Sequence, residues 1–324
     1  MAKINLIQTL NQTLRQQLAQ DKAVMILGED VGKVGGVFRV TEGLWQEFGN
    51  DRVVDTPLSE IGIISVSIGL ALAGMKPILE VQFDGFSVVM LDQIYHHAGR
   101  MRKRSQGKYH IPLVLRVPHG GGIRGLEHHS ESLETFFTHI PGIKVVTPSG
   151  PYTAKGLLIA AIADPDPVIF LEPKRVYRAI KEEVPDKPYT IPLNKTEVVQ
   201  TGNDLTIIAW GAMQRVVRSA ARQLQDTYSI EILDLLTLSP LDLKPIIESV
   251  QKTGRCVVVH EAPRTCGYGA ELIAVITEQA FLSLAAPVMR VTGYDIPVPL
   301  AKLEHYYIPD EARIIKAMEQ VMNF

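Results

Sequence analysis

Short apolar segments alternate with longer segments of helical length along most of this chain. In the first half, strands are predicted at residues 24–27, 52–54, 78–83, 113–117, 144–146 and 168–171. Helices are predicted between them at residues 61–73, 87–104 and 152–163. Alternation of this kind is typical of a mostly parallel sheet with helices on both faces.

A polar segment with three prolines, residues 181–195, interrupts the pattern and is typical of a linker. Beyond it the alternation resumes. Strands are predicted at 205–210, 230–233, 256–260 and 288–291, and helices at 214–225, 269–281 and 311–322. We therefore expect an α/β fold of two domains, residues 1–183 and 199–324, joined by a linker at 184–198.

The N-terminal segment shares one property with transit peptides, because its first 20 residues contain no acid. It carries only two basic residues, however, and Leu6, Leu10, Leu14 and Leu18 recur at every fourth position. This spacing predicts an amphipathic helix that docks on the domain.

Composition narrows the class of protein. The 324 residues are 46% hydrophobic and 21% charged, as in globular proteins with a substantial interior. The net charge of -2 gives no overall attraction to nucleic acid or to an anionic membrane. The two cysteines form no CxxC pair, and no apolar segment is long enough to span a bilayer. We therefore expect a cytoplasmic protein with neither nucleic-acid nor membrane partners.

One carboxylate, Glu60, stands where a predicted helix begins and directly before the apolar run 61–75. A carboxylate in that setting loses part of its hydration, which favours its protonated form and marks a candidate catalytic group. The alternative is an ordinary acidic residue in a first helical turn capped by Ser59. This segment by itself favours the alternative.

A glycine-rich loop at residues 120–130 follows a predicted strand and contains His128 and His129. Gly120, Gly122 and Gly125 fit GxGxxG, so a nicotinamide oxidoreductase is one hypothesis. The two histidines occupy the place where that motif requires a helix to open. A mobile active-site loop is the better interpretation, although adjacent histidines are more often surface residues.

Taken together, a series of short motifs resembles one family. In chain order they are residues 28–32 (GEDVG), 35–39 (GGVFR), 55–60 (DTPLSE), 82–83 (QF), 92–93 (DQ), 128–130 (HHS), 141–146 (PGIKVV), 151–158 (PYTAKGLL) and 164–168 (DPDPV). The chain resembles, from Leu6 to Phe324, the beta subunit of the thiamine-diphosphate-dependent decarboxylase component of 2-oxo acid dehydrogenase complexes. Many relatives have an acid in place of Thr153 and Gln in place of Glu131.

This resemblance implies a thiamine pyrimidine-binding domain followed by a transketolase-type C-terminal domain. It places on Glu60 the carboxylate that hydrogen-bonds the aminopyrimidine of thiamine diphosphate, and on Phe86 an aromatic face that stacks on the same ring. A phenylalanine after a strand is otherwise normally a core residue, and the two interpretations of Phe86 stay open. The resemblance also implies that His129, more than His128, assists acyl transfer to a lipoyl group, in a pH range where imidazole titrates.

A structural potassium site is also implied by the resemblance. Its positions here are Leu113, Ala161, Ile162, Asp164 and Asp166. Carbonyl groups that leave a helix C-terminus beside aspartates suit a hard cation. A plain helix-to-strand turn capped by aspartate is the alternative.

The family's diphosphate site uses a Gly-Asp-Gly motif, followed by Asn, to bind magnesium, and this chain has no Gly-Asp-Gly. The resemblance therefore implies that Mg²⁺ is held mainly by an alpha subunit, in an α2β2 heterotetramer with a second beta subunit and a lipoyl acyltransferase core as further partners. We expect oxidative decarboxylation of pyruvate, with a branched-chain 2-oxo acid as the alternative substrate. A self-contained transketolase-like enzyme and a non-catalytic assembly subunit are the competing hypotheses.

Overall fold

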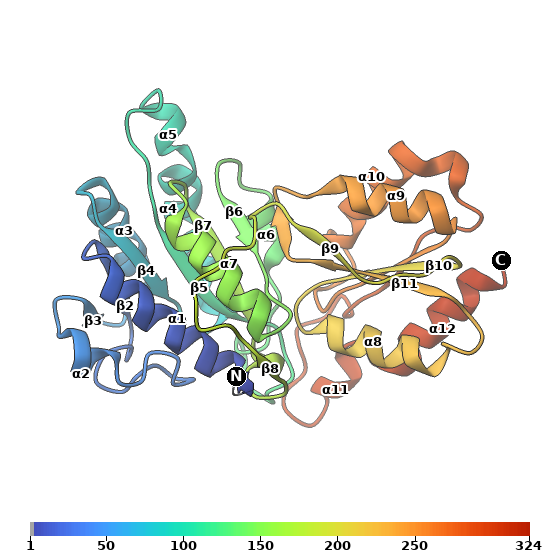
Figure 1. Cartoon of the computed structure of the whole chain (residues 1–324), viewed down its shortest axis with the longest axis horizontal. Helices are drawn as coiled ribbons and strands as arrows, with labels where there is room; N and C mark the ends of the chain where they lie inside the picture. The colour runs from blue at the N-terminus through green and yellow to red at the C-terminus, as the bar shows by residue number, and fades with distance from the viewer. Residues whose placement is uncertain (1–2) are drawn as a thin grey trace.

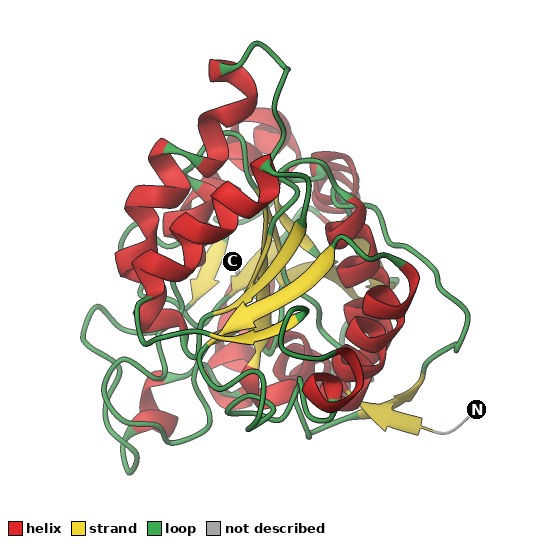
Figure 2. Cartoon of the chain, turned by 90° about the vertical axis from the view of Figure 1, so that its left-hand side faces the viewer, coloured by secondary structure: helices red, strands yellow, loops and turns green. Residues whose placement is uncertain are grey.

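The computed structural model describes residues 3–324, which form two α/β domains side by side, each built on its own sheet (Figure 1). The first domain contains the N-terminal part of the chain, blue to green in the figure, and the second contains the yellow-to-red part. Helices cover both faces of the central strands (Figure 2). The predicted fold class, two α/β domains with mostly parallel sheets, is confirmed.

The sheet of the first domain has seven strands, and all but one of its neighbouring pairs are parallel. Its strands in spatial order are β12 (Thr237–Ser239), β6 (Lys144–Val146), β7 (Val168–Pro173), β5 (Val114–His119), β4 (Lys76–Glu80), β2 (Val24–Gly28) and β3 (Val53–Asp55). The central strands are buried on both faces, which explains why they are continuous apolar runs without alternation.

Seven α-helices accompany this sheet within residues 3–200. They are α1 (Leu6–Gln20), α2 (Leu44–Phe48), α3 (Glu60–Leu72), α4 (Leu91–His96), α5 (Met101–Arg104), α6 (Glu134–Thr138) and α7 (Pro151–Ala163). Leu6, Leu10, Leu14 and Leu18 are all buried, so the predicted docking of α1 is confirmed. Helices α1 and α7 lie side by side (Figure 1).

The single helix predicted at 87–104 is wrong. This segment is divided into the 3-10 helix η1 (Asp84–Met90), α4, the 3-10 helix η2 (Ala98–Arg100) and α5. The break lies at His97, which leaves the helical region with φ -120° and ψ -66°. Gly99 follows and packs so closely that a Cβ there would lie 2.9 Å from the carbonyl oxygen of Pro141. Tertiary contact therefore overrides the local helical pattern.

The second domain has a five-stranded sheet that is parallel except at one edge. Its order is β14 (Met289–Val291), β13 (Cys256–Val259), β10 (Leu205–Ala209), β11 (Ile230–Leu235) and β9 (Thr196–Gln200). Its helices are α8 (Met213–Gln223), α9 (Leu243–Thr253), α10 (Gly269–Ala280), the 3-10 turn η4 (Phe281–Ser283), α11 (Glu304–Tyr307) and α12 (Glu311–Met322). The sequence pattern missed α9, α11 and β9.

The chain segment between the two domains runs from β8 (Lys181–Glu183), which pairs antiparallel with β1 (Lys3–Asn5), to β9 in the second sheet. The 3-10 turn η3 (Lys174–Val176) precedes it, between β7 and β8. No helix within residues 3–324 combines the length and the apolar character needed to cross a membrane.

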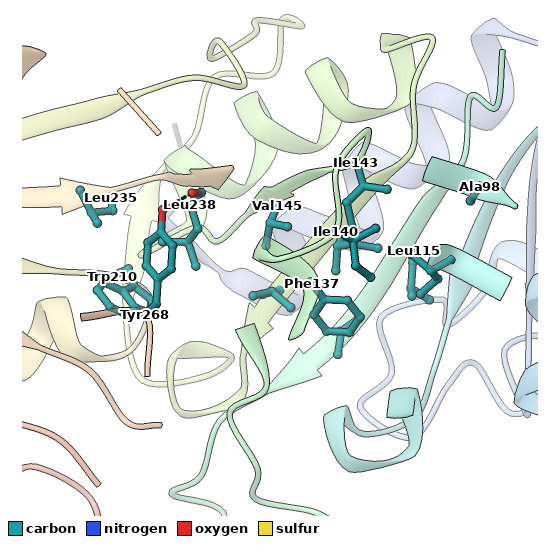
Figure 3. Close-up of a cluster of buried hydrophobic side chains, with 14 of the residues drawn as sticks. Ala98, Leu115, Phe137, Ile140, Ile143, Val145, Trp210, Leu235, Leu238 and Tyr268 are labelled. Atoms are coloured by element: carbon teal, nitrogen blue, oxygen red, sulfur yellow. Dashed lines mark hydrogen bonds between the residues drawn. The ribbon is translucent and has the colours of Figure 1, made fainter. Parts of the chain in front are cut away.

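One hydrophobic cluster is continuous across the junction of the two domains (Figure 3). Phe137 and Val145 of the first domain belong to it, together with Trp210, Leu238 and Tyr268 of the second. Strand β12 adds to the contact, because it belongs by sequence to the second half but pairs with β6 of the first sheet. The two domains are therefore joined by a shared core, which fixes the groups at their boundary.

Candidate functional site

The carboxyl edge of the first sheet collects the candidate groups. Strands β2, β3, β4 and β5 run parallel, so the segments that follow them emerge at the same edge. These segments carry Glu29, Glu60, Phe86 and the loop 120–130, called the histidine loop below. In open α/β sheets this edge is where ligands bind.

Glu60 is the first residue of α3. Ser59 adopts an extended conformation and its hydroxyl accepts the Gly62 N–H at 3.2 Å, which caps the helix and fixes where Glu60 stands. Ile63 and Ile64 are buried behind it, whereas Ile61 is 50% exposed and Glu60 itself is half-buried. The expectation of a dehydrated Glu60 is therefore only partly met by this chain alone.

Glu29 is a second carboxylate at this edge, and it was not predicted. It follows β2 directly and is 8% exposed, and its Oε1 atom has no hydrogen-bond partner within residues 3–324. Burial and the nearby negative charge of Glu60 raise the pKa of Glu29. The signal in the sequence was its position just after a strand that is parallel to the strand preceding Glu60.

Phe86 and His129 are brought together by the fold. The ring centres of Phe86 and His129 lie 5.2 Å apart in a T-shaped arrangement, and Phe83 lies 4.1 Å from His129. Phe86 is half-buried, so part of its ring remains accessible at the edge of the sheet. The glycine before it allows this contact, because a Cβ at Gly85 would lie 2.3 Å from the carbonyl oxygen of His128.

The two adjacent histidines differ in orientation. His129 is half-buried, and its Nδ1 lies 2.7 Å from the carbonyl oxygen of Glu127. Because a carbonyl can only accept, Nδ1 carries the proton and Nε2 is left to exchange one. His128 has a positive φ of 66°, its side chain is 64% exposed, and its nearest carboxylate is that of Glu131 at 3.8 Å.

The histidine loop is bound by carboxylates of the second domain. Glu261 accepts the N–H of Gly121 at 2.9 Å, and Glu304 accepts the N–H groups of Gly122 and Arg124, each at 2.9 Å. These are the donors that a GxGxxG motif would offer to a pyrophosphate, and no helix follows them before α6. The nicotinamide hypothesis drawn from this loop is therefore wrong.

Directly before the histidine loop, His119 lies between two buried carboxylates, those of Asp84 and Glu134. Asp84, fully buried, lies 2.7 Å from Nδ1 of His119 and accepts the Leu133 N–H at 2.9 Å. Burial opposes a charge on His119, but the Asp84 carboxylate outweighs it and raises the pKa of the imidazole. Burial also raises the pKa of Glu134, on the other side of the same ring. These residues were missed, since their partners come from different segments.

The five positions proposed for potassium gather where α7 ends and β7 begins. The Leu113 carbonyl accepts the Val168 N–H at 2.9 Å, and the Ala161 carbonyl accepts the Asp164 N–H at 3.3 Å. The carboxylate of Asp164 already binds Lys144 at 2.6 Å, and that of Asp166 binds Arg102 at 2.6 Å. Ile162 precedes this turn. Cationic side chains thus neutralise both aspartates. Throughout the described part of the chain, no group of three or more His, Cys, Asp or Glu side chains could hold a metal ion.

Comparisons with known proteins show which proteins this chain is similar to. Residues 2–180 match the family model "Transketolase, pyrimidine binding domain", and residues 194–314 match "Transketolase, C-terminal domain". A protein of Acholeplasma laidlawii named "Pyruvate dehydrogenase E1 component subunit beta" is 52% identical over 315 residues, covering 97% of this chain and 96% of that protein. A protein of the same name from Staphylococcus aureus (strain Mu50 / ATCC 700699) is 46% identical over 325 residues, covering both chains completely.

A solved structure titled "Split gene transketolase, inactive beta4 tetramer" superimposes with a TM-score of 0.80 over 99% of both chains. The two sequences are 19% identical, so this likeness concerns the fold.

Proposed function

The chain belongs to the family of pyruvate dehydrogenase E1 component beta subunits, and from this premise we propose that it works with an alpha subunit to decarboxylate pyruvate and acylate a lipoyl domain. Its relatives are named for pyruvate, so the branched-chain alternative is not favoured. The observation that supports the proposal best is the grouping of Glu60, Phe86 and His129 at the carboxyl edge of the first sheet.

The residues present fit the aminopyrimidine half of thiamine diphosphate. A half-buried carboxylate at a fixed helix start can accept or share a proton with a ring nitrogen, and an accessible aromatic face can stack on the ring. The orphaned oxygen of Glu29 is a further polar atom at this place. When bound, thiamine diphosphate supplies a nucleophilic carbon and an electron sink for the loss of carbon dioxide.

Glu60 shares a proton with the pyrimidine ring in this proposal, which requires that its hydration be reduced. Glu29 lies close enough to repel a second negative charge, and its raised pKa lets it keep a proton to higher pH than an exposed glutamate. Burial and mutual repulsion thus make it harder for both carboxylates to be ionised at once at the edge of an apolar helix. Covering Glu60 by a partner would complete the dehydration.

An alpha subunit is the partner that we assign to this surface. Helix α3, which begins at Glu60, exposes Ile61 (50%), Val66 (58%) and Leu72 (41%) along its length, and Leu58 before it is 82% exposed. Apolar groups gathered on one helix face mark a protein contact. We also assign Mg²⁺ and the diphosphate to the alpha subunit, in an α2β2 assembly that delivers its product to a lipoyl acyltransferase core.

His129 donates the proton that acyl transfer requires. Transfer opens the lipoyl disulfide, so one sulfur takes the acyl group and the other takes a proton. Because the Nδ1 proton is committed to the Glu127 carbonyl, the donated proton is the one on Nε2 of the imidazolium form, and the ring is left neutral with its proton on Nδ1. We further propose a potassium ion held mainly by the carbonyl oxygens of Leu113, Ala161 and Ile162, since Asp164 and Asp166 already have cationic partners. We also propose that the first domain ends at residue 183 and that the second begins at residue 199.

The role of Glu60 is tested by Glu60→Gln in the reconstituted α2β2 assembly. The substitution keeps the volume but removes the shared proton, so hydrogen–deuterium exchange at the thiazolium C2 carbon should fall by about a hundredfold or more. Glu278→Gln, an exposed position on α10, is the matched control. Exchange at the wild-type rate in Glu60→Gln would reject the assignment.

A further inference from the structure

We propose that Glu304, in the second domain, is the positioning residue that fixes the histidine loop over Phe83 and Phe86. Its carboxylate lies at the start of α11 and is 3% exposed. Oε1 accepts the Gly122 N–H at 2.9 Å and the Ser130 hydroxyl at 2.8 Å, and Oε2 accepts the Arg124 N–H at 2.9 Å. One side chain thus ties both ends of the loop, including the residue next to His129.

The backbone of the loop is shaped to receive this anion. Gly120, Gly122 and Arg124 have positive φ values of 78°, 90° and 56°, in alternation with ordinary residues. Such alternation turns successive N–H groups toward one point and forms a concave anion-binding site. Gly122 has no substitute here, because a Cβ would lie 2.1 Å from the Arg175 side chain. The glycine-rich motif is therefore explained by a carboxylate of the same chain.

Little else holds the middle of the loop. Leu126 is 74% exposed and Ile123 is 36% exposed, so the apolar side chains of the loop are not used as anchors. A cavity of about 450 Å³ borders Gly122 and Arg124 and leaves room for the loop to move. Glu261 supports the preceding turn through Gly121, upstream of the segment that carries His129. Charge-assisted hydrogen bonds to Glu304 thus tie that segment to the second domain, in addition to the packing of His129 on Phe83 and Phe86 in the first.

The second domain thereby acts on a site built on the first. The consequence for catalysis rests on the proposed function, in which His129 serves acyl transfer, whereas the restraint itself can be measured without it. Glu304→Gln is the variant of choice, because an amide presents one acceptor and turns an NH₂ donor toward groups that also donate. Ser130→Ala is a milder second variant, which removes one of the three donors.

The measurement is hydrogen–deuterium exchange of the reconstituted α2β2 assembly. In Glu304→Gln, amides of residues 119–132 should exchange about tenfold faster than in the wild type, as expected when hydrogen bonds to a charged group are lost. Ser130→Ala should give a smaller increase in the same segment. Exchange in β10 and β13, which form the core of the second domain, should stay unchanged. Glu319→Gln, exposed on α12, should change nothing.

Kinetics give the second readout. The kcat for acylation of a lipoyl domain should fall about tenfold in Glu304→Gln, with a smaller fall in decarboxylation coupled to an artificial electron acceptor. Unchanged exchange at 119–132 would overturn the proposal, and so would equal acceleration in β10 and β13, which would indicate general destabilisation. An assembly that fails to decarboxylate pyruvate would reject the proposed function, while the exchange data would still decide the role of Glu304.

Discussion

Glu60, Phe86 and His129 follow three different strands, and each is fixed by its immediate neighbours in a different way. A serine cap fixes Glu60, a glycine allows Phe86 to meet the histidine loop, and a carbonyl sets the protonated nitrogen of His129. These local constraints determine which atoms are free to exchange protons. They also make the roles of neighbouring residues separable by substitution.

His129→Ala should impair reduction of a lipoyl domain at least tenfold more than decarboxylation coupled to an artificial oxidant, because only the disulfide needs a proton as it opens (about 10²-fold is typical of general acid catalysis). His128→Ala is the matched control, since its exposed ring should affect both assays little. Both rates are measured on the reconstituted assembly. Equal losses for His129→Ala would assign it to substrate binding instead, and a larger loss for His128→Ala would reverse the choice.

The buried ammonium group of Lys174 should make the stability of the fold depend on pH. It is 3% exposed, its ammonium donates to the Pro118 carbonyl at 3.1 Å, and burial lowers its pKa from 10.5 to about 8. Between these values the unfolded chain binds more protons, so the free energy of unfolding should rise with pH, by about 3 kcal/mol in total. Denaturant titrations from pH 8 to pH 10.5 should show this rise. Lys174→Met should lack it, and parallel curves would refute the prediction.

The sequence could predict Glu60, Phe86 and His129 as candidates through its family resemblance, which rests on short motifs of neighbouring residues that occur in a fixed order. It could not predict Glu304, whose partner Gly122 is 182 positions away. Glu29 had a local signal, its position directly after a predicted strand, but its nearness to Glu60 could not be predicted because Glu60 follows a different strand. Contacts between distant segments leave no periodic or local pattern in a single sequence.

For helix α3 too, the sequence predicted less than the structure shows. Its apolar run was predicted as a helix, but the pattern did not show that one face would be buried against the sheet while Ile61, Val66 and Leu72 are exposed. An almost wholly apolar helix with one exposed face is best explained by a second protein surface. The histidine loop is a second example. Its glycines suggested a nucleotide-binding site, but its backbone N–H groups donate to the carboxylate of Glu304.

Val66→Asp should weaken association with the alpha subunit by about tenfold or more, because a charge would be buried in an apolar contact. The thermal midpoint of the isolated chain should hardly change, as Val66 is exposed there. Val66→Ala keeps the apolar character and should retain association. Sedimentation of the mixed subunits provides the measurement, and undiminished assembly of Val66→Asp would place the alpha subunit elsewhere.

In the proposed function, the two domains together supply the aminopyrimidine half of a thiamine diphosphate site. Alternation of strands and helices was enough to predict two parallel α/β domains, because both periodicities are local. It did not predict that β12 would cross into the first sheet or that one core would span the junction. At that junction, carboxylates of the second domain hold the histidine loop at the carboxyl edge of the first sheet.

Titration calorimetry with thiamine diphosphate and Mg²⁺ tests the half-site most directly. The isolated chain should bind the cofactor weakly and with little dependence on magnesium, since it contributes only the pyrimidine side. The reconstituted assembly of alpha and beta subunits should bind it tightly and only when magnesium is present. Tight, magnesium-dependent binding by this chain alone would contradict the account.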